Sequence, residues 1–353
     1  IAGAFGDLGT LLPLTLGAMA VAGLPAAGVL TAFGLAYLAT AFVFRAPIPV
    51  QPMKVAAAVL VTTAPDPSVA AGAALTLGVF FLLAGATGVI GRIARAIPDS
   101  VTAALQVGLA ASLAWTALTR MTDTPWLAAG LGALLLYLVV RRPSWPAAIL
   151  LLACGVVAAQ LLGLGPAGPL PAPAPQWPEL RWPALTALAS GTLEITLPQI
   201  PLTLTNALLV TATVGAQCFP EAQRLHVNTL ALTTGAANLL AAPLGGIPMC
   251  HGAGGVTAHY RFGARTGIAP AVIGITLLTL GIGWGAGAAT VLAHLPSAAL
   301  GVLLLLPAID LARAARPRRF PMDERVLVLM GAAVAFRHPG AAFLLTLIAV
   351  LAL

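Results

Sequence analysis

The feature that most constrains this chain is a succession of apolar stretches, each about 20 residues long and separated by Pro, Gly or Arg. Of the 353 residues, 59% are hydrophobic and only 8% are charged. A soluble domain carries roughly 25% charged residues, so this composition excludes an ordinary water-soluble globule. The sequence therefore predicts an all-α polytopic membrane protein.

We expect about fourteen transmembrane segments, because a helix that crosses a bilayer needs about 20 predominantly apolar residues. Two of them, 50–64 and 249–262, are too short to cross as helices and follow sequence rich in Pro or Gly. The predicted spans are 3–22, 26–44, 50–64, 69–91, 98–118, 125–140, 144–163, 188–216, 225–243, 249–262, 268–294, 297–312, 322–335 and 338–353.

The arginines predict the orientation of these spans, because cytoplasmic loops of membrane proteins carry an excess of Lys and Arg. With a cytoplasmic N-terminus, three arginines fall outside (Arg120, Arg181 and Arg337) and thirteen fall inside. The net charge of +7 is therefore a topology signal, and a nucleic-acid partner is not expected. The inner arginines are Arg45, Arg92, Arg95, Arg141, Arg142, Arg224, Arg261, Arg265, Arg313, Arg316, Arg318, Arg319 and Arg325.

Two halves of the chain, separated by a proline-rich stretch from Gly165 to Trp182, resemble each other weakly. The run Pro-Leu-Thr-Leu occurs at 13–16 and again at 201–204, and Ile-Pro occurs at 48–49 and again at 247–248. Because each half holds an odd number of predicted spans, the second half is expected to be inverted relative to the first. Matched Gly/Pro-interrupted segments in inverted halves point to a transporter's binding site, although chance similarity between apolar sequences is the alternative.

Lys54 is the only lysine of the chain, and it follows the proline-rich run 47–52 inside a predicted span. The prolines prevent a helix before about residue 50 and suit the first turn afterwards, so Lys54 is expected in the first turns of a half-helix near the membrane midplane. A charge in hydrocarbon costs at least about 2.5 kcal/mol, and a lysine at a positive helix N-terminus needs an anion nearby. The anion is either a bound oxyanion or a structural partner, Asp7 or Glu194.

The matching segment in the second half is the Gly-rich run 245–255, which contains Cys250 and His251. Its glycines allow close approach of a ligand, and the amides that start the next helix can donate to oxygen atoms. Two such N-termini with Lys54 beside them predict a site for a small oxyanion. The alternatives are a nucleophile or metal pair at Cys250 and His251, and a purely packing or capping role for His251.

Two carboxylates near the predicted site are candidates for proton coupling, because they lie early in the equivalent first and eighth spans. These are Asp7 and Glu194, and the alternative is that they neutralise Lys54 or cap helices. Asp310 is a further charge within or near a span. Uncharged donors along the same faces either bind substrate or bond to a neighbouring helix; they are Thr10, Gln51, Gln199, Thr203 and Asn206.

Four stretches of the sequence resemble the plant and bacterial molybdate transporters, which are related to the sulfate permease superfamily. They are GAFGDLGTLLPLTL, PVQPMK, PQIPLTLTNALL and GGIPMCHGAGGVTAHYRFGARTG, and the resemblance runs from residue 3 to about 267. It implies two inverted seven-span repeats of the uracil-permease type, an extended segment before each half-helix, and usually a homodimer. Carried over by motif, the substrate-binding residues are Gln51, Lys54, His251, Gly252, Ala253, Gly254 and Gly255, and the structural or gating residues are Tyr260, Arg261 and Arg265. His259 stands where the resemblance implies a glutamine-like residue.

The resemblance also implies a division into a core domain, 1–96 and 186–295, and a gate domain, 97–185 and 296–353. We therefore predict a secondary-active importer of molybdate in the bacterial plasma membrane, with an elevator mechanism, no cofactor and no enzymatic activity. Sulfate and tungstate are alternative substrates. Rival functions are an anion channel and a permease for planar nucleobases, and the second is disfavoured because the motifs hold few aromatic residues.

Overall fold

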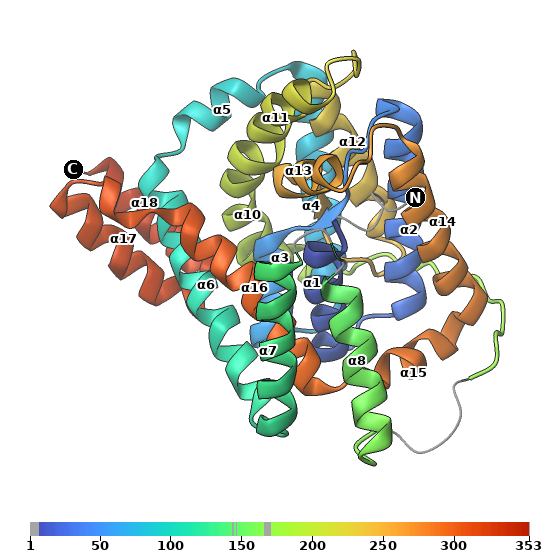
Figure 1. Ribbon diagram of the computed structural model, residues 1–353. Helices are drawn as coiled ribbons and strands as arrows, with labels where there is room; N and C mark the ends of the chain where they lie inside the picture. The colour runs from blue at the N-terminus through green and yellow to red at the C-terminus, as the bar shows by residue number, and fades with distance from the viewer. Residues whose placement is uncertain (1–6, 143–144, 146, 166–170, 353) are drawn as a thin grey trace.

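A computed structural model describes residues 7–142, 145, 147–165 and 171–352, and in them nearly all regular structure is helical (Figure 1). The first half holds α1 (Leu8–Ala22), α2 (Ala26–Phe44), β1 (Gln51–Pro52), α3 (Lys54–Thr63), α4 (Pro67–Thr87), α5 (Ile90–Ala96), α6 (Asp99–Met121), α7 (Pro125–Arg141) and α8 (Ala147–Leu161). The second half begins with α9 (Leu185–Gly191), the π-helical turn η2 (Thr192–Thr196), α10 (Leu197–Leu202), the π-helical η3 (Thr203–Leu209), α11 (Val210–Cys218) and α12 (Val227–Ala241). It continues with β2 (Met249–Cys250), α13 (Ala253–Arg261), α14 (Ile268–Trp284), the 3-10 turn η4 (Gly285–Gly287), α15 (Ala288–Ala293), α16 (Ser297–Ala315), the 3-10 turn η5 (Pro317–Arg319), α17 (Met322–Ala335) and α18 (Pro339–Leu351).

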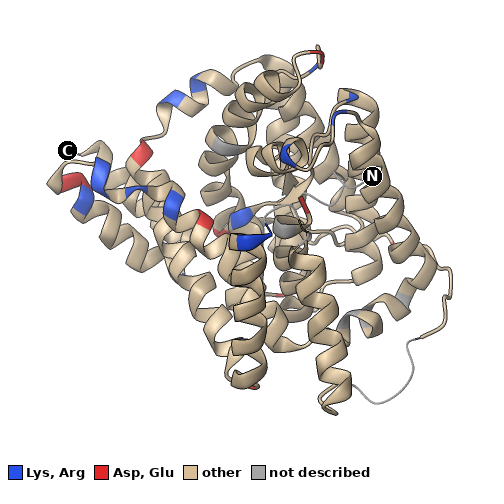
Figure 2. Ribbon diagram, in the orientation of Figure 1, with Lys and Arg blue, Asp and Glu red and all other residues tan. Residues whose placement is uncertain are grey.

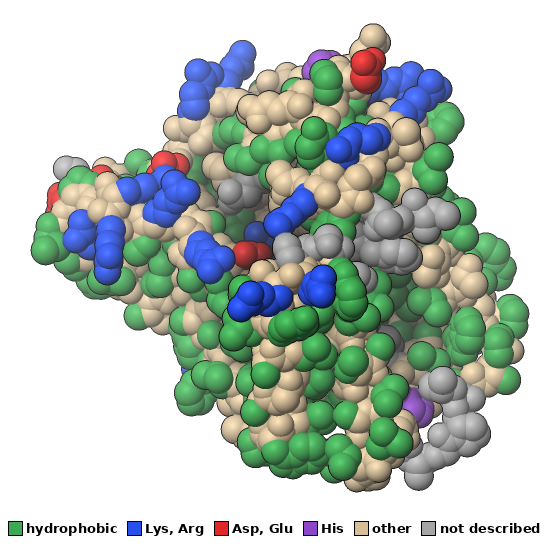
Figure 3. Space-filling view, viewed as in Figure 1, with side chains coloured by type: hydrophobic (Ala, Val, Ile, Leu, Met, Phe, Trp, Pro, Cys, Tyr) green, Lys and Arg blue, Asp and Glu red, His purple; other side chains and the backbone are tan. Residues whose placement is uncertain are grey.

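Long apolar helices identify the chain as an integral membrane protein. Within the described residues, five helical segments are long and apolar enough to cross a bilayer: Ala26–Phe44, Pro67–Thr87, Asp99–Met121, Leu185–Cys218 and Ser297–Arg319. Apolar side chains cover much of the surface, as the lower part of Figure 3 shows. Lys and Arg gather in the upper and central parts of the view, and the lower third shows almost none (Figure 2).

The helices pack as two groups that lie on opposite sides of the view in Figure 1. In one group α2 packs on α14 and α4 packs on α12, and in the other α6 packs on α16 and α17. Glycines let the first two pairs approach closely, because a side chain at Gly34 would meet the Gly274 carbonyl and one at Gly235 would meet the Gly78 carbonyl. Small residues at helix crossings are the usual device for dense packing inside a membrane.

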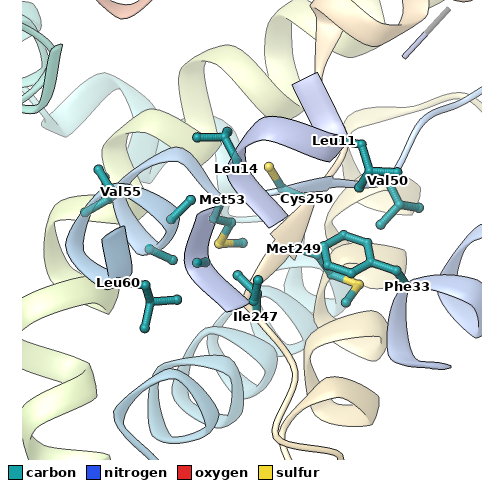
Figure 4. Packing of buried hydrophobic residues seen from close by; sticks show 14 of the residues in the cluster. Leu11, Leu14, Phe33, Val50, Met53, Val55, Leu60, Ile247, Met249 and Cys250 are labelled. Carbon is teal, nitrogen blue, oxygen red and sulfur yellow. The ribbon is translucent and has the colours of Figure 1, made fainter. Parts of the chain in front are cut away.

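A two-stranded ribbon joins the two halves of the chain at the centre of the molecule. Strands β1 and β2 are antiparallel, with Gln51 opposite Cys250 and Pro52 opposite Met249. The expected extended segment before each half-helix is thereby confirmed. Around the ribbon, Met53, Ile247 and Met249 belong to one buried apolar cluster (Figure 4).

The predicted span 268–294 is wrong as one continuous segment. Helix α14 ends at Trp284, and Gly285 takes a positive φ of 48° before the turn η4 and the short α15. Such a backbone angle is readily adopted by glycine and interrupts a helix. The span 188–216 is also irregular, because it alternates between α-helical and π-helical turns around Pro198 and Pro201.

Candidate functional site

A cavity of about 160 Å³ lies between the central ribbon and the helices α6 and α16. Figure 3 shows a hollow with Lys and Arg side chains around it near the centre of the view. The cavity is lined by Thr10, Gln51, Pro52, Lys54, Gln106, Gln199, Leu202, Ala207, Val210, Cys250, Gly252, Ala253, Gly254, Asp310, Leu311 and Ala314. Seven of the predicted site residues are therefore brought together: Thr10, Gln51, Lys54, Gln199, Gly252, Ala253 and Gly254.

Two helix N-termini meet at this cavity. Helix α3 starts at Lys54 and α13 starts at Ala253, each within three residues of the end of a strand of the antiparallel ribbon, so the helices leave the ribbon in opposite directions. Neither N-cap residue, Met53 or Gly252, uses a side chain to cap its helix. Among the described residues, no acceptor bonds to the amides of Ala253 and Gly254. The positive ends of both helices and free amide donors thus face a shared space, which suits an anion.

Lys54 adds a full positive charge to this space. Its side chain is partly buried and forms no hydrogen bond or ion pair with any described residue. The ion pairs between described residues are Arg181 with Glu179 and Arg319 with Asp99. The alternative in which Lys54 is held in a structural ion pair with Asp7 or Glu194 is therefore not observed in this part of the chain.

Asp7 is buried and does not line the cavity, but it orients Gln51, which does. The Tyr37 hydroxyl donates to Asp7 Oδ2 over 2.8 Å, and Gln51 Nε2 donates to Asp7 Oδ1 in a very short contact. Gln51 packs so tightly on the start of α13 that a side chain at Gly252 or Gly255 would collide with it. Gly255 is thus a packing residue and does not line the cavity.

Gln199 fixes the first turn of α3. Its Oε1 accepts from the Val55 backbone amide over 2.8 Å, and its Nε2 donates to Thr203 Oγ1 over 2.8 Å. Thr203 is fully buried, so it orients Gln199 and does not line the cavity. The side chain of Asn206 lies outside the described part of the structure.

His251 stabilises the ribbon and does not face the cavity. Its Nδ1 bonds to the Pro49 carbonyl over 2.9 Å, its Nε2 bonds to Thr233 Oγ1 over 2.8 Å, and Phe44 packs edge-on against its ring. The packing interpretation of His251 is the one observed. Within the described residues no group of three or more His, Cys, Asp or Glu could hold a metal ion, and Cys250 contributes only to the cavity wall.

The predicted position of Glu194 near the central site is wrong. Its side chain is exposed and lines a different cavity of about 580 Å³, together with Arg337 and His338. Glu194 lies in the π-helical turn η2 and Gln199 in α10, so regular α-helical spacing does not give the direction of one side chain relative to the other. The position of Glu194 early in the eighth span therefore does not determine the direction of its carboxylate.

Two polar residues of the cavity were not predicted as binding residues. Gln106 is buried on α6, and Asp310 is exposed on α16. Both lie on helices of the expected gate, outside the sequence motifs that resemble the transporter family. Asp310 carried a usable signal, because it is a charge inside an otherwise apolar predicted span.

The sequence is similar to known molybdate transporters. A family model described as "Molybdate transporter of MFS superfamily" matches residues 1–113 and 191–311. Molybdate transporter 2 of Arabidopsis thaliana is 29% identical over 97% of this chain and 84% of its own length. Molybdate transporter 1 of Arabidopsis thaliana is 29% identical over 93% of the chain and 82% of its own length.

Solved structures show the same fold at low sequence identity. The transmembrane domain of a cyanobacterium bicarbonate transporter, BicA, superposes with a TM-score of 0.65 at 17% identity, covering 99% of this chain and 97% of that one. The murine anion transporter Slc26a9 in the inward-facing state superposes with a TM-score of 0.71 at 11% identity, covering 99% of this chain and 67% of that one. The family match covers well over half of the sequence and holds nearly every residue of the central cavity. The chain is therefore a transporter, not an enzyme, and belongs to the molybdate transporter family.

Proposed function

We propose that this protein is a secondary-active transporter that imports molybdate. The observation that carries the proposal is the cavity in which two half-helix N-termini face one space with Lys54, which pairs with none of the described residues. A dianion needs such compensation, since a single charge already costs several kcal/mol, on the order of 3 or more, inside a bilayer. Membership of the molybdate transporter family supports the choice of molybdate as the substrate.

Sulfate and tungstate are the competing substrates, because they are tetrahedral dianions of nearly the same shape. Isothermal titration of the purified protein with molybdate, tungstate, sulfate and uracil would rank them. We expect molybdate to bind most tightly and uracil not to bind, since the described residues that line the cavity include amides and a cation but no aromatic side chain. Preferential uracil binding would contradict the proposal.

The proposed mechanism is an elevator of two inverted seven-span repeats. In it a core of residues 1–96 and 186–295 moves past a gate of residues 97–185 and 296–353. The packing of α2 on α14, matched by that of α12 on α4, supports an inverted repeat, and so does the position of the equivalent prolines Pro49 and Pro248 before the two strands. The described part of the proline-rich loop, 171–184, fits better with the core, because Gln176 and Arg181 donate backbone hydrogen bonds to Ile282 and Pro243.

The orientation and assembly are further parts of the proposal. We propose the bacterial plasma membrane as the location. The uneven distribution of Lys and Arg supports a cytoplasmic N-terminus, and import is then transport towards the arginine-rich side (Figure 2). We propose a homodimer formed through the gate. Cross-linking of the detergent-solubilised protein, followed by mass measurement, tests this assembly directly.

Proton coupling is proposed through Asp7, with Glu194 as the second candidate. Asp7 accepts hydrogen bonds on both carboxylate oxygens, from Tyr37 and Gln51, so protonation would compete with the bond that orients Gln51. Glu194 is less suited, because it lies in another cavity. Molybdate uptake driven by an imposed pH gradient, compared between wild type, Asp7→Asn and Glu194→Gln, decides whether either carboxylate couples transport to protons.

The rival function on the same fold is an anion channel. Counterflow in proteoliposomes separates the two, because a carrier loaded with unlabelled molybdate accelerates entry of labelled molybdate, whereas a channel conducts without this trans-stimulation. We expect trans-stimulation that Lys54→Ala abolishes. Steady conductance without exchange would support the channel.

A further inference from the structure

The gate side of the central cavity carries a carboxylate that an anion site does not need. Asp310 lies on α16 and lines the same cavity as Lys54, which lies on α3. Neither side chain forms a hydrogen bond or an ion pair with any residue that the structure describes. Two opposite charges therefore share one small cavity, and no other described residue neutralises either of them.

We propose that Asp310 competes with the oxyanion for Lys54, so that substrate enters the cavity by displacing a resident counter-ion. This inference rests on the proposed function. A carboxylate facing a bound dianion is repulsive. The cavity is only about 160 Å³, so the two charges lie close enough for the repulsion to persist although Asp310 is exposed to solvent. In the empty cavity this carboxylate is the one acidic group among the described lining residues, so it is available to the ammonium group of Lys54, which pairs with no other described residue.

The location of Asp310 gives this competition a consequence for transport. Lys54 belongs to the proposed core and Asp310 to the proposed gate, so relative movement of the two domains separates them. The carboxylate then weakens oxyanion binding only in the conformation in which the cavity adjoins α16. A ligand whose affinity differs between two conformations shifts their populations by that difference, so Asp310 favours release of the anion in this conformation.

The test is isothermal titration of the purified full chain with molybdate at fixed pH and ionic strength. Asp310→Asn is expected to bind molybdate roughly tenfold more tightly, which corresponds to about 1.4 kcal/mol. Asp310→Glu keeps the charge and should restore affinity to near the wild-type value. Asp323→Asn removes an exposed carboxylate of α17 that does not line the cavity, and its affinity should match the wild type.

The outcomes separate this inference from the proposed function. If the wild-type protein binds no tetrahedral oxyanion, the proposed function fails. If the wild type binds molybdate and Asp310→Asn binds it equally or more weakly, the competition is overturned while the proposed function stands. The thermal unfolding midpoint of each substrate-free variant is measured alongside, and an affinity gain in Asp310→Asn without a lower midpoint excludes a merely structural effect.

Discussion

At the scale of single residues, Gln51 connects the buried interior to the central cavity. Its Nε2 donates to the carboxylate of Asp7, which also accepts from the Tyr37 hydroxyl. A carboxylate can only accept hydrogen bonds, so it selects the orientation of the Gln51 amide in which the NH₂ group points away from Gly252. The Oε1 atom then packs on Gly252, where a side chain would collide with it.

This packing predicts that Gly252→Ala weakens molybdate binding at least roughly tenfold, because the new methyl group must displace Gln51 or move the start of α13. Isothermal titration measures the loss. Gly254 offers a matched comparison two residues later, where an added Cβ meets no atom within 4 Å. Gly254→Ala should therefore lose less affinity than Gly252→Ala, and the reverse order would contradict the role given to Gln51.

Lys54 is predicted to contribute most of the electrostatic part of binding. Lys54→Gln should weaken molybdate binding by roughly a hundredfold, since removing one member of a poorly solvated charge pair costs about 2–5 kcal/mol. The molybdate affinity of Lys54→Arg should lie between those of the wild type and Lys54→Gln. The charge remains in this variant, but the larger planar guanidinium does not fit the same space. Arg224→Gln removes an exposed cation outside the cavity and serves as the control. Unchanged molybdate binding in Lys54→Gln would contradict the assignment of the central cavity as the substrate site.

The sequence identified Lys54 and its glycine-rich counterpart because a lone lysine and a run of glycines are conspicuous in an apolar chain. The same reasoning failed for Glu194, since a charge in a predicted span does not reveal which side of the helix it lies on. Gln106 had no signal, because a single amide in an apolar helix is commonplace and usually bonds to a neighbour. His251 and Thr203 were predicted to bind substrate, and only their contacts in the structure show that they are packing residues.

At the scale of elements, the central ribbon depends on a side chain from α12. Each strand has only two residues, so it offers few backbone hydrogen bonds of its own. Asn238 extends the pairing, because its Nδ2 donates to the Met249 carbonyl over 2.6 Å and its Oδ1 accepts from the Met249 amide over 3.0 Å. Asn238 therefore acts as a third partner that holds β2 in place.

Replacing this partner is predicted to destabilise the whole site. Asn238→Leu leaves the amide and the carbonyl of Met249 without their buried partner, and each such group costs about 1–3 kcal/mol. We expect a lower thermal unfolding midpoint and loss of molybdate binding. Asn228→Leu, at an exposed position of the same helix that makes no bond to the ribbon, is the control for the introduction of leucine. Equal effects of the two substitutions would show that the bonds to Met249 are unimportant.

Prolines and glycines predicted the elements around the site but not their irregularities. The run at 47–52 and the one at 245–255 anticipated an extended segment followed by a short helix, because proline restricts the backbone before a helix starts. The π-helical turns η2 and η3 were not anticipated, since the same apolar residues fit an α-helix equally well. The break at Gly285 depends on one positive φ angle inside a sequence that is apolar on both sides.

At the scale of the whole molecule, transport by an elevator requires the proposed core to slide on the proposed gate. The two meet where α1 packs on α16, and a side chain at Gly17 would lie 3.4 Å from Leu304 Cδ2. The proline-rich loop follows the core instead, because Trp284 Nε1 donates to the Pro171 carbonyl over 3.0 Å. A side chain at Gly287 would lie 3.5 Å from Pro171 Cβ. These two contacts, one between the proposed domains and one between the loop and the proposed core, distinguish sliding from other movements.

Paired cysteines at these contacts test the sliding movement. In a background without the native Cys154, Cys218 and Cys250, first checked for molybdate binding, the pairs are Gly17→Cys with Leu304→Cys, and Pro171→Cys with Gly287→Cys. A short bifunctional thiol reagent should abolish counterflow in the first pair but preserve molybdate binding, because the core is locked against the gate with its cavity intact. The second pair should be cross-linked without loss of counterflow, since both of its members move together. Full counterflow in the cross-linked first pair would mean that the site opens to both sides without movement of α1 along α16.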